Sequence, residues 1–276
     1  MTAKGLLGDS AGRDYSRKLS LFNACAQPEL RQAIASLQLR PGMHAVDVGC
    51  GTGETLGWLQ AALQPGGRVV GVDLAAAHLQ AARRHSPADI LIAQADALRL
   101  PLRAAHFDLV WCVNTLNHLR EPVEAIRQWG TLLRNSGRIA LGQSSLLPEM
   151  FFAWDARLER IVNDAVRQYY RERYGVSERE LTAVRALLGV LRQAKLRNVW
   201  SRTFMIERIS PLHAVDEIYL TEAIFRDTWG ERLRPYLEAC DYAELCRLCD
   251  PADPAFALRR PDFHYLQSFT LVVGER

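Results

Sequence analysis

The chain has 276 residues, of which 49% are hydrophobic and 24% charged, and its net charge is +3 at pH 7. A chain of this length can bury a large core, and its mixed charges form no one-sign patch that would indicate a nucleic-acid partner. No apolar stretch approaches the ~20 residues that cross a bilayer, and the first residues, "MTAKGLLGDS", do not resemble a secretory signal. We expect a soluble protein without a membrane span.

Cysteine and lysine usage indicate the compartment and the source. The 6 cysteines are scattered along the chain, which favours reduced thiols and a cytoplasmic location over disulfides. The only lysines are Lys4, Lys18 and Lys195, and this preference for arginine suggests a high-GC bacterial genome.

Residues 28–143 alternate between predicted helices and strands, which indicates a layered α/β domain with a mainly parallel sheet. Helices are expected at 28–39, 54–63, 75–85 and 121–133. Strands are expected at 44–49, 67–74, 89–96, 107–114 and 137–143.

After Gln143 the pattern becomes mostly helical. A long helical tract is expected at 148–175 and a second helix at 177–196, followed by a strand at 198–209. Residues 211–261 again look helical, and the last strand is expected at 265–275.

A glycine-rich turn follows the first predicted strand, in the stretch "HAVDVGCGTGETL". Asp47 lies two residues before Gly49, and Gly51 and Gly53 follow at alternate positions. Glycine lets a ligand lie against the backbone where a strand passes into a helix. Asp73, at the end of the second strand, can accept hydrogen bonds from both hydroxyls of a ribose. This geometry predicts a site for an adenosine-bearing cofactor, and the spacing differs from the G-x-G-x-x-G of nicotinamide enzymes.

Four motifs in order resemble the class I S-adenosylmethionine-dependent methyltransferases, closest to the branch that methylates quinones and natural products. They are "VDVGCGTG" (46–53), "VVGVDL" (69–74), "QADALRLP" (94–101) and "FDLVWCVNTLNHL" (107–119). The resemblance implies an α/β, Rossmann-like fold with a seven-stranded, mostly parallel sheet and helices on both faces. Its last strand would lie antiparallel between the fifth and the sixth.

The resemblance also implies a division of the chain into core and lid. Residues 28–145 would form the cofactor-binding core, to which 177–210 add a helix and the sixth strand and 263–276 the final strand. The lid would consist of the N-terminal segment 1–27 and two helical insertions, 146–176 and 211–262.

The same resemblance assigns residues to the cofactor, S-adenosyl-L-methionine. The Gly49–Gly53 turn, which includes Cys50 and Gly51, would pass under the methionine half, and Asp47 would hold the amino end. Asp73, next to Leu74, would bind the ribose, and Asp96 with Ala97 would contact the adenine.

Two further cofactor contacts come from other segments. Asn114 would lie beside the methionine moiety, and Tyr15 would fold over the cofactor. Alternatively, Asp96 only begins a turn and Tyr15 only covers the core.

Aromatic residues of the lid suggest a small, partly apolar organic acceptor. They are Phe151, Phe152, Trp154, Tyr169, Tyr170, Tyr219, Phe225 and Trp229. We expect Phe152 and Tyr170 among the acceptor contacts, although such helical stripes are often core.

His118 is the candidate general base because it follows the fourth strand and its imidazole titrates near working pH. The alternative is a histidine that packs, caps or shapes the pocket wall. His264 and Glu149 are further candidates at the same sheet edge, with His264 also expected to contact the acceptor.

Three other functions stay open from the sequence. An RNA or protein methyltransferase is the first, although the chain reads "NTLN" where amino-directed nucleic-acid methyltransferases have a proline-rich motif. A metalloid methyltransferase is suggested by Cys240, Cys246 and Cys249, but buried structural cysteines are favoured and no metal is expected. The third is a module that binds the cofactor without turnover. The oligomeric state is not predicted.

Overall fold

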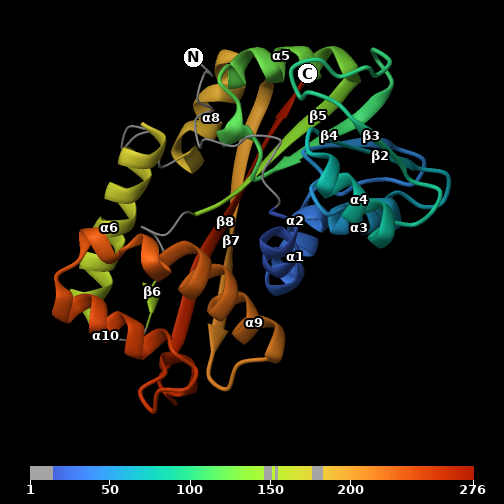
Figure 1. Ribbon diagram of the computed structural model, residues 1–276. Coiled ribbons are helices and arrows are strands. Elements are labelled where there is room, and N and C mark those ends of the chain that lie inside the picture. Colours follow the sequence, from blue (N-terminus) through green and yellow to red (C-terminus); the bar gives the residue numbers. More distant parts are fainter. Residues whose placement is uncertain (1–14, 146–150, 153–154, 176–182) are drawn as a thin grey trace.

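The computed structural model describes residues 15–145, 151–152, 155–175 and 183–276. Its first part alternates strands and helices, as the sequence predicts (Figure 1). The strands there are β1 (His44–Val48), β2 (Arg68–Asp73), β3 (Leu91–Gln94), β4 (Phe107–Val113) and β5 (Leu133–Ser144). The helices are α1 (Ser16–Cys25), α2 (Gln27–Ser36), α3 (Glu54–Leu63), α4 (Ala76–His85), η1 (Leu116–His118) and α5 (Pro122–Leu132).

One sheet organises the molecule, in the order β3-β2-β1-β4-β5-β8, with β7 on the other side of β8. Strands β1 to β5 are parallel. The last strand, β8 (His264–Glu275), lies antiparallel between β5 and β7 (Arg197–Ile209). This confirms the expected sheet of seven strands, with the last one antiparallel between the fifth and the sixth. An eighth strand, β6, is added to it.

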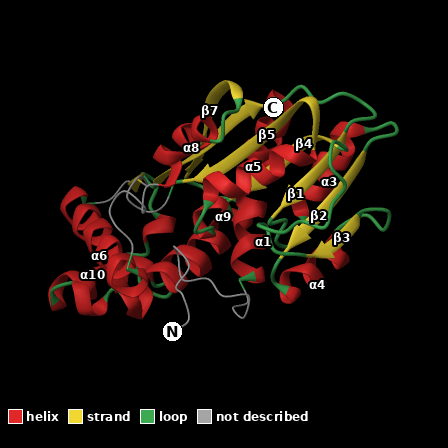
Figure 2. Cartoon of the chain, turned by 90° about the horizontal axis from the view of Figure 1, so that it is seen from above, coloured by secondary structure: helices red, strands yellow, loops and turns green. Residues whose placement is uncertain are grey.

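Alternate side chains of the strands enter two separate apolar clusters, one on each face of the sheet. Ala45 of β1 packs with α2 and α3, through residues such as Leu30 and Leu59. Val46 points to the other face, where it packs with α5 and α8 (Ala183–Gln193). The sheet is therefore covered by helices on both faces, as Figure 2 shows.

The long strands β7 and β8 extend past β5, and a mostly helical part of the chain surrounds their extension (Figure 1). Its elements are β6 (Phe151–Phe152), α6 (Ala156–Tyr174), α9 (Ala214–Ile218), the π-helix η3 (Tyr219–Trp229) and α10 (Ala239–Cys249). Short 3-10 helices η4 (Gly230–Arg232), η5 (Arg234–Tyr236) and η6 (Ala257–Arg259) complete it.

The strand β6 differs from the sequence prediction, which placed Phe151 and Phe152 in a helix. Their backbone pairs antiparallel with Leu266 and Tyr265 of β8. This part of β8 lies beyond the end of β5, so a segment added there continues the sheet. None of the helices that the structure describes is long and apolar enough to span a membrane.

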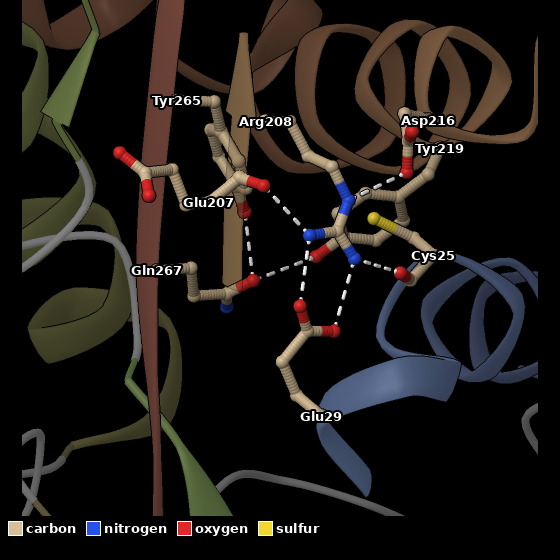
Figure 3. Close-up of polar contacts among 8 residues, drawn as sticks. All are labelled: Cys25, Glu29, Glu207, Arg208, Asp216, Tyr219, Tyr265 and Gln267. Carbon is tan, nitrogen blue, oxygen red and sulfur yellow. Dashed lines mark hydrogen bonds and ion pairs between the residues drawn. The ribbon is translucent and has the colours of Figure 1, made fainter. Parts of the chain in front are cut away.

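Arg208, near the end of β7, joins the strand to three helices (Figure 3). Its guanidinium donates two hydrogen bonds to Glu29 of α2, at 2.9 and 3.0 Å, and one to Asp216 of α9, at 2.9 Å. It also donates to the backbone carbonyl of Cys25, at the end of α1. Buried contacts of one side chain therefore fix α1, α2 and α9 against the sheet.

Candidate active site

A cavity of about 440 Å³ opens at the carboxyl ends of the parallel strands. Ligands of open α/β sheets bind at this edge. Its walls come from the residues that follow β1, β2, β4 and β5, and from α1 and η3 of the helical part. Of the residues assigned to the cofactor from the sequence, the cavity is lined by Tyr15, Asp47, Gly49, Cys50, Gly51, Asp73, Leu74, Asp96, Ala97 and Asn114.

The three glycines of the turn have positive φ angles and three different surroundings. A Cβ on Gly49 would lie 2.1 Å from the Thr115 hydroxyl oxygen, whereas one on Gly51 would meet only Leu19, at 3.3 Å. Gly53 does not line the cavity, and a Cβ there would lie 2.9 Å from Ala82 of α4. Gly51 is therefore the least crowded of the three glycines, while Gly53 lets α4 pack closely.

Asp73 is tied to the glycine turn at the end of β2. One carboxylate oxygen accepts the Gly51 amide at 2.9 Å, and the other accepts the Ala75 amide at 2.8 Å. His78 lies 3.4 Å from the same carboxylate. Burial opposes ionisation, but the hydrogen bonds from His78, Ala75 and Gly51 outweigh it and lower the pKa of Asp73. An ionised carboxylate at this place can accept hydroxyl groups of a ligand.

Asp47 is the more deeply buried of the two acids, with only 2% of its surface exposed. Its carboxylate accepts a hydrogen bond from the Thr55 hydroxyl at 2.5 Å. Burial raises the pKa of Asp47 to about 7, against the opposing effect of the Thr55 bond. Burial likewise raises the pKa of the neighbouring Cys50 thiol.

The residues after β3 and β4 contribute through their backbone as much as through their side chains. Asp96 accepts the Leu98 amide at 2.9 Å, so it does begin a turn and also lines the cavity. The Ala97 carbonyl accepts the Trp129 indole N–H at 2.7 Å. Asn114 has a φ of +52° and accepts the Ser144 amide at 2.8 Å, which joins the ends of β4 and β5.

His118 ends the 3-10 helix η1 and lines the cavity, as does Asn117 beside it. The side-chain oxygen of Asn117 is buried, and within the described part of the chain it has no hydrogen-bond partner. A buried polar atom without a partner is costly, so a ligand that donates a hydrogen bond would stabilise this wall.

The expected lid residues divide into three groups. Tyr170 of α6 and Tyr219 of η3 line the cavity. Phe225 and Trp229 are buried and stack on each other with ring centroids 5.3 Å apart, so they are core. Glu149, Trp154 and the side chains of Phe151 and Phe152 lie outside the described residues.

The expectation for His264 is corrected, because it does not line the cavity. Side chains of β8 alternate between the two faces, and in the first half of the strand the buried ones are Tyr265, Gln267 and Phe269. His264 therefore points to the opposite face, where its imidazole lies 2.8 Å from Glu207.

Sequence reasoning missed several polar residues of the cavity. Gln267 accepts the Tyr265 hydroxyl at 2.7 Å (Figure 3). It also donates to the Ser145 carbonyl at 2.9 Å. The polar residues 143–145 could have been predicted from the sequence as cavity residues, because they stand at the carboxyl end of a buried strand. Other cavity residues that were missed are Lys18, Thr55, His78, Asn117, Ser144, Thr228 and Arg232.

The cysteines of α10 do not come together as one cluster of ligands. Cys240 and Cys246 are exposed and Cys249 is half-buried. In the ranges that the structure describes, no three histidine, cysteine or acidic side chains come together as metal ligands.

Comparison with known proteins finds similarity in the central part of the chain. A family model for a methyltransferase domain matches residues 46–141. The 27-O-demethylrifamycin SV methyltransferase of Amycolatopsis mediterranei is 35% identical over 117 residues, 41% of this chain and 42% of that protein. The 2-phytyl-1,4-naphtoquinone methyltransferase of Thermosynechococcus vestitus is 34% identical over 146 residues, 50% of this chain and 64% of that protein. The matched part of this chain thus spans less than half of the first relative.

A solved structure extends the likeness in fold to nearly the whole chain. The geranyl diphosphate C-methyltransferase of Streptomyces coelicolor gives a TM-score of 0.52, covering 98% of this chain and 86% of that one. At 14% sequence identity the similarity is one of fold.

Proposed function

We propose that this chain, in which residues 46–141 form a methyltransferase domain, transfers a methyl group from S-adenosylmethionine to a small, partly apolar organic acceptor. The observation that carries the proposal is the pairing of the Gly51 amide with the Asp73 carboxylate in the cavity wall. It places an acid for a ribose beside an open backbone, at the carboxyl edge of the sheet.

The residues present fit such a cofactor. A Cβ on Gly51 would point toward Leu19 in the cavity wall, so its absence leaves space there. The buried Asn117 oxygen is an acceptor available to an amino or hydroxyl group. The acids Asp47 and Asp73 suit a ligand that carries both an ammonium group and ribose hydroxyls.

Each cofactor residue then has one task. Asp73 binds the ribose, Asp47 holds the amino end, and Asp96 with Ala97 borders the adenine. Asn114 lies beside the methionine half, and its bonds to β5 fix it there. Tyr15, the residue before α1, covers the cofactor.

Positioning is the main contribution of the protein to the reaction. When bound, S-adenosylmethionine supplies a methyl group on a sulfonium, which an acceptor atom takes by in-line displacement. The cavity walls from α1, α6 and η3 hold the acceptor in line and exclude water, and such orientation can lower a barrier by up to ~7–11 kcal/mol. Where the acceptor arrives protonated, His118 takes its proton. Tyr170, which lines the cavity, lies against the acceptor. From the sequence, Phe152 is proposed as a second acceptor contact.

The similar proteins support the proposed class of acceptor, and the cysteines support the proposed compartment. The two relatives act, by their names, on 27-O-demethylrifamycin SV and on 2-phytyl-1,4-naphtoquinone, which favours a natural-product or quinone-type acceptor here too. The six cysteines are free thiols, which favours a reducing, cytoplasmic compartment. The preference for arginine over lysine favours a bacterial source.

Label transfer tests the proposal. The protein is incubated with methyl-labelled S-adenosylmethionine and an extract of a high-GC bacterium, separated into small-molecule, RNA and protein fractions. We expect label in the small-molecule fraction. Label confined to RNA or protein would support the macromolecular alternative, and no transfer despite binding of S-adenosylhomocysteine would support a binding module.

The same assay tests His118 with the labelled acceptor in hand. If His118 is the base, His118→Ala lowers turnover ~10²–10⁴-fold with little change in cofactor affinity. A variant with full turnover would leave His118 as part of the pocket wall.

A further inference from the structure

Two cations, Lys18 of α1 and Arg232 of η4, line the cavity. The cofactor assignment does not use either of them. The three acids of the same cavity, Asp47, Asp73 and Asp96, lie at or just after the carboxyl ends of β1, β2 and β3. The two cations instead come from helices that face this edge, so the negative and the positive side chains lie on different walls of the cavity.

Lys18 is held in place by η3. Its ammonium donates to the Thr228 hydroxyl at 2.9 Å, and Thr228 in turn donates to the Ala223 carbonyl at 2.6 Å. Thr228 is buried, with 4% of its surface exposed. The ammonium therefore has a fixed position against the cavity wall.

The two acids of η3, Glu222 and Asp227, are already paired with other arginines. Glu222 accepts Arg17 at 2.9 Å and Arg226 at 3.5 Å, and Asp227 lies 3.0 Å from Arg226. Across the described ranges, no carboxylate lies within ion-pair distance of Lys18 or Arg232. Lys18 and Arg232 thus line the cavity with no ion-pair partner in the described part of the chain.

The electrostatic surroundings of Lys18 disfavour its charge. Burial, together with the positive charge of Arg232, lowers the pKa of Lys18 to about 8, against the opposing effect of Asp227. An anion in the cavity would offset the burial of the ammonium and separate the two like charges.

We propose that Lys18 and Arg232 bind an anionic group of the methyl acceptor, such as a carboxylate, sulfate or phosphate. The assignment of this anion to the acceptor rests on the proposed function. With Tyr170, Tyr219 and Ile224 on the adjoining walls, the cavity then fits an organic anion with an apolar body.

A matched pair of fluorescent probes tests the charge requirement without any turnover. Anilinonaphthalene sulfonate and N-phenylnaphthylamine share one apolar ring system, and only the first carries an anionic group. We expect Lys18→Met to raise the Kd of the sulfonate about tenfold or more and to leave that of the neutral amine within about twofold. Arg232→Gln should act in the same direction, and Lys18→Arg should keep the binding.

Lys195→Met is the control, because Lys195 is exposed and lies after α8. It should change neither Kd. The proposal would be overturned by a wild-type protein that does not bind the sulfonate, by a sulfonate Kd unchanged in Lys18→Met, or by equal losses for both probes.

A second pair of ligands distinguishes the acceptor from the cofactor as the source of the anion. S-adenosylhomocysteine carries a carboxylate, and methylthioadenosine lacks it. We expect Lys18→Met to bind both about as tightly as the wild type does. A selective loss of S-adenosylhomocysteine binding would assign the cations to the cofactor and overturn the proposal. Because these experiments measure binding alone, they can succeed or fail independently of the label-transfer assay.

Discussion

At the scale of one residue, Asp47 lowers the stability of the folded protein in order to form the cavity wall. Its carboxyl group is buried, and its hydrogen bond from Thr55 does not restore an ordinary pKa. A buried carboxylate is stabilised by a nearby positive charge. The ammonium group of the proposed cofactor would supply that charge, which explains why an acid stands at a place that otherwise destabilises the fold.

The raised pKa of Asp47 predicts a pH dependence of stability. Below about pH 4 the group is neutral in both states. Between about pH 4 and 7 the unfolded state ionises first, so the folded state binds more protons and its stability falls as the pH rises. Relative to Asp47→Asn, which keeps an acceptor for Thr55, the wild type should lose up to about 1.4 kcal/mol of unfolding free energy per pH unit in this window.

Urea denaturation of both proteins from pH 4 to 8 checks this. A difference between them that does not change with pH would mean that Asp47 titrates normally.

The glycine motif shows which residue roles the sequence predicts. That the turn lies at a cavity followed from the spacing of Asp47, Gly49 and Asp73. The separate requirement at Gly49 depends on Thr115, which comes 66 residues later, and no local pattern reports such a contact. Alternate side chains of β8 face opposite sides, so Gln267 faces the cavity and His264 does not. Which set faces the cavity depends in the same way on which face of the strand is covered.

At the scale of elements, the contacts of Arg208 decide where α1 stands over the cavity (Figure 3). The Arg208 side chain is 13% exposed, and those of its partners Glu29 and Asp216 are 11% and 4% exposed. Removing the Arg208 guanidinium leaves the buried carboxylates of Glu29 and Asp216 without their positively charged partner. Loss of one member of a buried ion pair typically costs 3–5 kcal/mol, because the other charge stays desolvated.

We therefore expect Arg208→Met to lower the free energy of unfolding by about 3–5 kcal/mol. The control is Arg157→Met, which breaks the more exposed pair with Asp241 and should cost no more than about 1 kcal/mol. Chemical denaturation at pH 7 measures both. Equal, small effects would show that Arg208 does not hold the helices in place.

Helices and strands were predicted well where the local sequence pattern determines them. They were predicted poorly where contact with another element determines them. The alternation of strands and helices up to β5 follows from hydrophobic periodicity. The strand β6 forms because the edge of β8 is open there, and a two-residue strand has no periodicity of its own. Likewise η3 is a π-helix over 11 residues, which apolar spacing does not distinguish from an α-helix.

At the scale of the whole molecule, the sheet order explains the position of the site. With β8 antiparallel between β5 and β7, the carboxyl ends of β1 to β5 and the helical part that follows β7 meet at one edge. The cavity lies there, with acids from the strand ends and cations from the helices. The strand order came from the resemblance to a family, whereas the two cations belong to segments without any transferable motif.

The most direct test of the account is the binding of S-adenosylhomocysteine, measured by calorimetry at pH 7. Asp73→Asn removes a carboxylate oxygen and the charge, and Asp164→Asn, on the exposed part of α6, is the matched control. The account predicts that the wild type and Asp164→Asn bind alike, and that Asp73→Asn binds at least about tenfold more weakly with its fold intact. Unchanged binding by Asp73→Asn, or no binding by the wild type, would contradict the placement of the cofactor in this cavity.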